Sequence, residues 1–313
     1  MSETLLDTFD LTLGTFFGLG VRLSPLYLVA FVLIAFLVFR KSKPGQGFWA
    51  WLFPAAIYRH ASHWMDIKLF VFDRLIALFA GLSALAITTG TASGIVERLA
   101  ESPFSGSFQA IAIMAFATLI INDFVAYWVH RISHQWQVFW PFHAVHHSAE
   151  VMSPITNYRK HPVYVLISVV VRGLVVGVFQ ALVFALMVGR VDIWMIGSVN
   201  AAYFIFHVLG SNLRHSHVWF SYGPVLERIL ISPAQHQIHH STKIVHFNKN
   251  FGEVLAIWDW MFGTLYIPKA REDLTFGLTA VSGQKVVQPH ATFLKALLVP
   301  FRDSARAMAR KKR

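Results

Sequence analysis

Three tight clusters of histidine are the feature that most constrains the fold of this chain. Eight of its sixteen histidines lie in these clusters, and the chain has no cysteine. Spacings of three and four residues place side chains on one face of a helix, and imidazole binds first-row metals without carrying charge. A lone histidine is usually satisfied by one hydrogen bond, but three such clusters predict a nitrogen-rich site for two metal ions. The clusters are His130-x-x-x-His134, His143-x-x-His146-His147 and His236-x-x-His239-His240.

Each cluster has a local reason to be helical. His130 and His134 are one turn apart at the end of a long apolar segment. Pro141 precedes the second cluster and Pro233 precedes the third, and proline is favoured in the first turn of a helix. We therefore expect two short helices that meet the end of a long one around the metals.

The composition is that of a membrane protein. Hydrophobic residues make up 55% of the chain and charged residues 14%, outside the range of ordinary soluble domains. Lipid-facing backbone must satisfy its own hydrogen bonds. The predicted fold class is therefore all-α, a polytopic membrane helical bundle of about four to five spans with a cytoplasmic histidine-rich di-metal helical cap. The five apolar segments are Leu23–Phe39, Leu75–Thr91, Gln109–Val129, Val163–Val188 and Ile193–Leu209.

The loops between these segments differ in charge. The first loop is rich in basic residues and the next holds Arg98 alone, so the positive-inside rule places the N-terminus outside and the clusters and C-terminus in the cytoplasm. Attraction to anionic lipid headgroups then explains the net charge of +11 without a nucleic-acid partner. Arg172, inside the fourth segment, must face protein or reach the interface. The basic residues of the first loop are Arg40, Lys41, Lys43, Arg59 and Lys68.

We expect one integral-membrane domain over residues 1–313. Its catalytic region should cover about residues 110–268, followed by a basic cytoplasmic tail at 269–313. The first segment has no basic region or cleavage site before it, which predicts an anchor and not a signal peptide. Short cytoplasmic loops favour a bacterial inner membrane.

Further motifs accompany the histidines. The stretch Asp123-Phe-Val-Ala-Tyr-Trp-Val-His130-Arg-Ile-Ser-His134 is followed later by Asn250-Phe-Gly252 and by Trp258-Asp259-x-x-Phe262-Gly263-Thr264. Together with the clusters, this pattern resembles the fatty acid hydroxylase and sterol desaturase superfamily of integral-membrane di-iron oxygenases. The resemblance extends from about Tyr58 to Tyr266.

The resemblance implies two iron ions as cofactor and O2 as co-substrate, with zinc as a substitute on overexpression. It also implicates His215, in Arg214-His215-Ser-His217, as a ligand. His217 stands where relatives carry a carboxylate, so its role stays open. The predicted metal ligands are His130, His134, His143, His146, His147, His215, His236, His239 and His240.

Four further residues are candidates for a supporting role next to the ligands: Asp123, His161, His207 and Asp259. Asp123 either pairs with Arg131 or Arg159, or accepts a hydrogen bond from a ligand histidine. Asp259 has the same two alternatives. His161 matches an R-x-H-P motif of the family, whereas His207 is a ligand, a supporting donor or a packed residue.

The function predicted is hydroxylation of a lipid C–H bond with O2. Electrons would come from an external donor, a ferredoxin or a cytochrome with its reductase, because no dinucleotide fingerprint or thiolate ligand is visible. Desaturation of a sterol or related lipid is the alternative on the same scaffold. A membrane metal-binding or transport protein is the alternative of another class, although transporters place their sites near the middle of the membrane. The lipid and the oligomeric state stay open.

Overall fold

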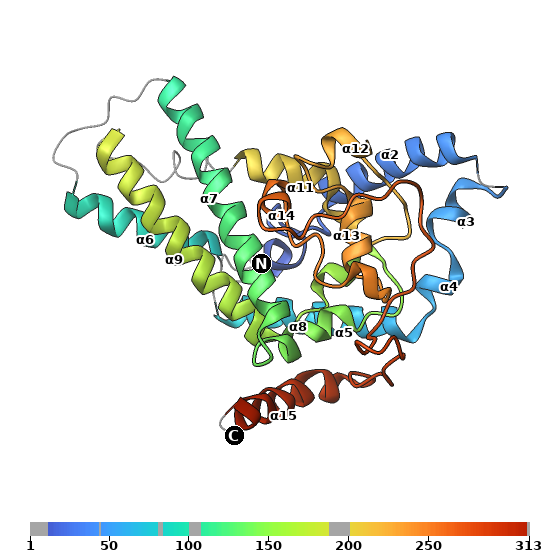
Figure 1. Ribbon diagram of the computed structural model, residues 1–313. Helices are drawn as coiled ribbons and strands as arrows, with labels where there is room; N and C mark the ends of the chain where they lie inside the picture. Colours follow the sequence, from blue (N-terminus) through green and yellow to red (C-terminus); the bar gives the residue numbers. More distant parts are fainter. Residues whose placement is uncertain (1–11, 44, 81–83, 100–107, 188–200, 312–313) are drawn as a thin grey trace, which may run out of the picture.

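The computed structural model describes residues 12–43, 45–80, 84–99, 108–187 and 201–311 (Figure 1). These residues form helices and loops, with isolated bridges in place of strands, which confirms the all-helical class. From residue 25 onward the helices in chain order begin with α2 (Pro25–Ser42), α3 (Phe48–Leu52), α4 (Ala55–Tyr58), α5 (Ala61–Ala80), α6 (Ala84–Leu99), α7 (Phe108–Gln135) and α8 (Trp140–His147). They are followed by η1 (Pro154–Tyr158), α9 (Pro162–Met187), α11 (Ala201–Arg214), α12 (Gly223–Leu226), α13 (Pro233–His239), η2 (Ile244–His246), α14 (Ile257–Met261) and α15 (Phe293–Lys311).

Helices α6, α7 and α9 form a bundle that extends away from the rest of the described chain (Figure 1, left). Helices α7 and α9 have 28 and 26 residues. At about 1.5 Å per residue each is about 40 Å long, more than the bilayer core of about 30 Å. Helix α9 approaches α6 closely at Gly177, where an added Cβ would lie 2.7 Å from Thr91 Cβ.

Two of the described helices are long and apolar enough to cross a membrane, over Pro25–Ser42 and Pro162–Val183. They correspond to the first and fourth predicted segments. The third predicted segment lies within α7. The second is divided between α5 and α6, with residues 81–83 outside the described ones, and the fifth is described only from Ala201 onward. The number of spans therefore stays a prediction.

The start of α2 lies beside the histidine clusters. Arg22 donates hydrogen bonds to Asn157 Oδ1 at 3.1 Å and to Glu253 Oε1 at 3.0 Å. A first span running from outside to cytoplasm would separate Arg22 from these residues. These contacts place the N-terminal end of α2 beside the clusters, and the orientation of the chain in the membrane stays a prediction.

The two short histidine helices form where the prolines predict them. Pro141 lies in the first turn of α8, and Pro233 begins α13. Ser232 and Gln235 close a capping box at the start of α13. Ser232 Oγ accepts from the Gln235 backbone N–H at 3.1 Å, and Gln235 Oε1 accepts from the Ser232 backbone N–H at 2.9 Å. These bonds fix the start of α13, the helix that carries His236 and His239 of the third cluster.

The C-terminal segment folds back onto α8 and is not a free tail over its described length. Ala296 of α15 packs in one hydrophobic cluster with Met65, Leu69 and Val145. Val145 lies between two of the predicted ligands of α8. Farther along, Ser304 Oγ donates to the Val138 carbonyl at 2.8 Å. Helix α15 therefore supports the helix that carries the second cluster.

Candidate metal centre

The structure brings all nine predicted ligand histidines together in two groups. Within each group, one ring nitrogen from every histidine lies within 4.8 Å of those of the others. We call them the five-histidine group and the four-histidine group. The first consists of His130, His134, His143, His147 and His239, and the second of His146, His215, His236 and His240.

The five-histidine group contains ring nitrogens that the described chain leaves unsatisfied. Nε2 of His134, His147 and His239 and both ring nitrogens of His143 are buried and have no hydrogen-bond partner among the described residues. Buried polar atoms without partners are costly. Because these nitrogens converge, a metal ion bound among them would satisfy several at once. The donor set fits a nitrogen-binding first-row metal.

Backbone carbonyls orient two members of this group. Nδ1 of His130 donates to the Phe251 carbonyl at 2.8 Å, and Nδ1 of His239 donates to the Lys249 carbonyl at 2.7 Å. A proton on Nδ1 leaves the lone pair of Nε2 directed into the group. Metal-binding histidines in proteins are usually held in this way.

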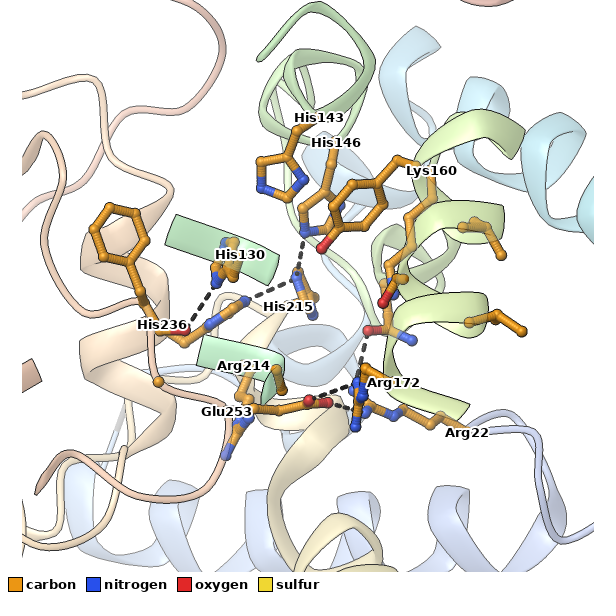
Figure 2. Close-up of a pocket in the computed structure, with 18 residues that line it drawn as sticks. Arg22, His130, His143, His146, Lys160, Arg172, Arg214, His215, His236 and Glu253 are labelled. Carbon is orange, nitrogen blue, oxygen red and sulfur yellow. Dashed lines mark hydrogen bonds and ion pairs between the residues drawn. The ribbon is translucent and has the colours of Figure 1, made fainter. Parts of the chain in front are cut away.

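The four-histidine group converges through Nε2 atoms. His215 Nε2 lies 3.2 Å from His146 Nε2 and 3.0 Å from His236 Nε2. Both contacts are drawn in Figure 2. His240 Nε2 lies 3.2 Å from His236 Nε2. Helices α8 and α13 and the segment after α11 each contribute to this group.

Burial keeps these imidazoles neutral. The pKa values of His143, His146, His236 and His240 lie well below the ordinary histidine value, first because burial disfavours the cation and second because neighbouring histidines repel it. A neutral imidazole offers a lone pair to a metal at physiological pH. The site is thus electrostatically prepared for a cation.

Asp259 holds the segment that orients His130. Its carboxylate accepts from the backbone N–H groups of Phe251 at 2.8 Å and Gly252 at 2.7 Å, and from Thr264 Oγ1 at 2.6 Å. A Cβ on Gly252 would lie 2.5 Å from the Leu255 carbonyl oxygen, so only glycine fits. Burial raises the pKa of Asp259 to about 6, and its hydrogen bonds oppose that rise.

Asp123 holds the backbone of the next two residues after Glu253 in the same way. It accepts from the backbone N–H groups of Val254 at 2.7 Å and Leu255 at 2.8 Å, and from Trp258 Nε1 at 2.9 Å. Both predicted alternatives for Asp123 and for Asp259, an arginine pair or a ligand histidine, are therefore wrong. Backbone N–H groups donate to both carboxylates instead, together with Trp258 Nε1 for Asp123 and Thr264 Oγ1 for Asp259.

The other candidate histidines lie outside both groups. His161 Nδ1 accepts from the Val163 N–H at 3.1 Å and its Nε2 donates to the Leu297 carbonyl at 3.0 Å. It thus joins the start of α9 to α15 and does not bond to a ligand. His207 Nε2 lies 3.6 Å from Glu253 Oε1, and His217 Nε2 donates to the Trp51 carbonyl at 2.8 Å.

Arg159 has a partner that the sequence did not suggest. Its NH1 lies 2.8 Å from Asp66 Oδ1, and both side chains are almost completely buried. Its Nε also donates to the Val145 carbonyl at 2.9 Å, and its NH2 to Ser148 Oγ at 3.0 Å. This buried ion pair joins α5 to the end of α8. Residue 66 is too far from 159 in sequence for any local pattern to reveal the pair.

Two cavities are each lined by several of these histidines. One, of about 230 Å³, is lined by His130 and His143 from the five-histidine group and by members of the four-histidine group. The other, of about 540 Å³, is lined by His134, His147 and His239 and by residues of the 277–290 segment. The candidate metal centre is therefore reachable by small molecules through more than one space.

Comparisons with known proteins show what this part of the chain resembles. Residues 115–264 match the fatty acid hydroxylase family. These residues therefore carry a fatty acid hydroxylase domain. The matched residues carry all nine clustered histidines, and the resemblance seen in the sequence is confirmed.

Individual relatives are named for lipid oxidation. Ornithine lipid hydroxylase OlsE of Rhizobium tropici is 30% identical over 60% of this chain and 50% of its own length. Alkylglycerol monooxygenase of Homo sapiens is 31% identical over 50% of this chain and 31% of its own. A protein of Arabidopsis thaliana named as a Delta(7)-sterol-C5(6)-desaturase is 26% identical over 50% of this chain and 49% of its own. The chain thus spans half or less of these relatives, and no solved structure matches it.

Proposed function

We propose that this chain is a membrane-bound, O2-dependent monooxygenase that hydroxylates a C–H bond of a lipid. The observation that carries the proposal is the convergence of nine neutral histidines, seven buried and two partly buried, in two groups beside a cavity. Relatives named as an ornithine lipid hydroxylase and an alkylglycerol monooxygenase support a lipid substrate and this reaction.

The nine histidines would hold two iron ions, one in each group. When bound, such an iron pair supplies the activation of O2 that removes hydrogen from an unactivated C–H bond. The residues of this chain hold the metals, orient the imidazoles through the Phe251 and Lys249 carbonyls, and shield the site from bulk water. Electrons come from a separate donor, a ferredoxin or a cytochrome with its reductase.

The membrane placement belongs to the same proposal. Exposed apolar residues on α2 and α9, among them Leu33, Leu37 and Leu174, would face lipid. The basic residues Arg131 and Lys160 lie near the histidine end of the α6–α7–α9 bundle, which favours the cytoplasmic face of a bacterial inner membrane.

Desaturation is the second candidate, because one relative is named as a sterol desaturase and both reactions begin with removal of a hydrogen atom. Metal transport is less favoured. The histidine groups lie at the ends of α7 and α8, whereas a transporter places its ligands near the middle of its spans.

The test compares the lipids of cells that express the wild-type chain with those of cells that express His146→Ala. We expect one lipid class to gain an oxygen atom only with the wild-type chain, as measured by mass spectrometry. Loss of two hydrogens without gain of oxygen would establish the desaturase instead. An unchanged lipidome in the presence of a redox donor would contradict both.

A further inference from the structure

The smaller cavity beside the histidines is strongly cationic. Besides the histidines, four basic side chains line it and Glu253 is the one acidic residue among the residues found to line it (Figure 2). The basic residues are Arg22, Lys160, Arg172 and Arg214. The imidazoles are neutral, so they do not offset this charge. Positive charge of this kind beside a substrate space is expected to attract anions.

Glu253 neutralises only part of the charge. Its Oε1 lies 3.0 Å from Arg22 NH2, and its Oε2 lies 3.0 Å from Arg172 NH1. Arg172 also donates to Asn122 Oδ1 at 3.0 Å, so it faces protein as the sequence predicted. Among the lining residues, one carboxylate thus stands against four basic side chains, so their summed charge is positive.

Lys160 is the most informative of these cations. No hydrogen bond or ion pair of its ammonium group is found in the part of the chain that the structure describes. Burial, together with the charges of Arg22 and Arg172, lowers its pKa to about 8, while Glu253 and Asp73 oppose that shift. Lys160 is partly buried, and even partial loss of hydration by an ammonium group has a cost when no counter-charge is bonded to it. An anion in the cavity would offset that cost.

The neighbouring space is of the opposite character. An apolar cavity of about 210 Å³ lies between α7 and α9, lined by residues such as Val129, Phe142, Ile167 and Val171. Tyr164 lines both this cavity and the cationic one. The cationic cavity and the apolar cavity thus adjoin at Tyr164. This arrangement suits a molecule with an ionic head and a hydrocarbon tail.

We infer that the cationic cavity binds the carboxylate or phosphate group of an anionic lipid substrate, with Lys160, Arg22 and Arg172 as its partners. The inference rests on the proposed function and specifies its substrate class. The cavity is smaller than typical ligand pockets of about 300–1,000 Å³, so it holds a headgroup and a few carbons and not a whole lipid. Because histidines of both groups line the same cavity, the oxidised C–H bond lies close to the headgroup.

The binding test uses the full-length metal-loaded protein in neutral detergent. Retention of dioleoylphosphatidic acid, oleate and dioleoylglycerol is compared by native mass spectrometry. We expect the two anionic lipids to be retained about tenfold better than the neutral one, the size of effect that a charge-assisted contact supplies. Equal retention of anionic and neutral lipids by the wild-type chain would overturn the inference.

Matched variants locate the effect. Lys160→Met should remove most of the preference, and Lys160→Arg should restore it. Lys285→Met changes an exposed lysine outside the cavity and should leave the preference intact. An unchanged preference in Lys160→Met, or an equal loss in Lys285→Met, would contradict the assignment. The thermal midpoint of each variant shows whether it is folded, and the wild-type comparison stands without any variant.

Two further measurements separate the possible sources of an anion and the two proposals. If inorganic phosphate binds the protein while anionic and neutral lipids are retained equally, the cavity is a site for a free anion. That result would overturn the headgroup inference. In cells, the oxidised lipid could be neutral, absent with His146→Ala and still present with Lys160→Met. This result would support the proposed oxygenase and contradict the inference of an anion site. An oxidised anionic lipid that depends on both residues supports the two together.

Discussion

Asp259 and His130 are connected through a single residue. The carboxylate of Asp259 accepts from the backbone N–H of Phe251, and the carbonyl of the same residue accepts from His130 Nδ1. The geometry of a candidate ligand therefore depends on a carboxylate that does not touch it. Asp259 and His130 belong to separate motifs in the sequence, and the structure joins them through Phe251.

Asp259→Asn is expected to loosen this segment. The amide keeps the size of the carboxylate but has one oxygen for three donors, so one buried donor is left unpaired. We expect a loss of about 2 kcal/mol in stability and a lower metal content, measured by thermal unfolding and elemental analysis. Asp273→Asn, at an exposed position, is the control. Full metal content and an unchanged midpoint in Asp259→Asn would show that the connection is not needed.

The two histidine groups predict separable metal losses. His143→Ala removes a member of the five-histidine group and His236→Ala a member of the four-histidine group. If each group holds one ion, each change should lower the metal content by about one ion per chain. His217→Ala changes a residue outside both groups and should leave the metal content unchanged. The assignment of one ion to each group would be contradicted if either ligand variant kept its full metal content. An equal loss of metal from His217→Ala would also contradict it.

The buried pair of Asp66 and Arg159 predicts a large effect on stability. Arg159→Met leaves the carboxylate buried without its partner, at an expected cost of about 3–5 kcal/mol. Arg302→Met removes one of the two arginine partners of Asp303 at the surface and should cost about 0–1 kcal/mol. Thermal unfolding in detergent compares the two. Similar small losses in both variants would mean that the buried pair is not important for the fold.

Lys160 predicts how pH affects the retention of anionic lipid. Its pKa is lowered to about 8 by burial and by Arg22 and Arg172, against Glu253 and Asp73, which raise it. The ammonium is charged below that value and loses its proton above it, while the arginines stay charged. Retention of phosphatidic acid should therefore fall as pH rises through about 8. The decline should be absent in Lys160→Met, and an equal decline there would point to another group.

The sequence predicted the parts of the site that depend on local spacing. Cluster spacing and the prolines at 141 and 233 indicate short helices, and the nine histidines meet as expected. The partners of Asp123 and Asp259 were missed because backbone N–H groups leave no pattern in side-chain identity. The cationic cavity was missed because Arg22 and Lys160 come from segments more than a hundred residues apart. Only the folded chain brings such residues together.

The central claim is that this chain uses O2 to oxidise a lipid at the histidine site. Its most direct test is mass spectrometry of lipids from cells grown under isotopically labelled O2, with wild-type chain or with His146→Ala. We predict one lipid class that carries a single labelled oxygen atom with the wild-type chain and none with the variant. Unlabelled oxygen in the product, or the same labelled product with His146→Ala, would contradict the account.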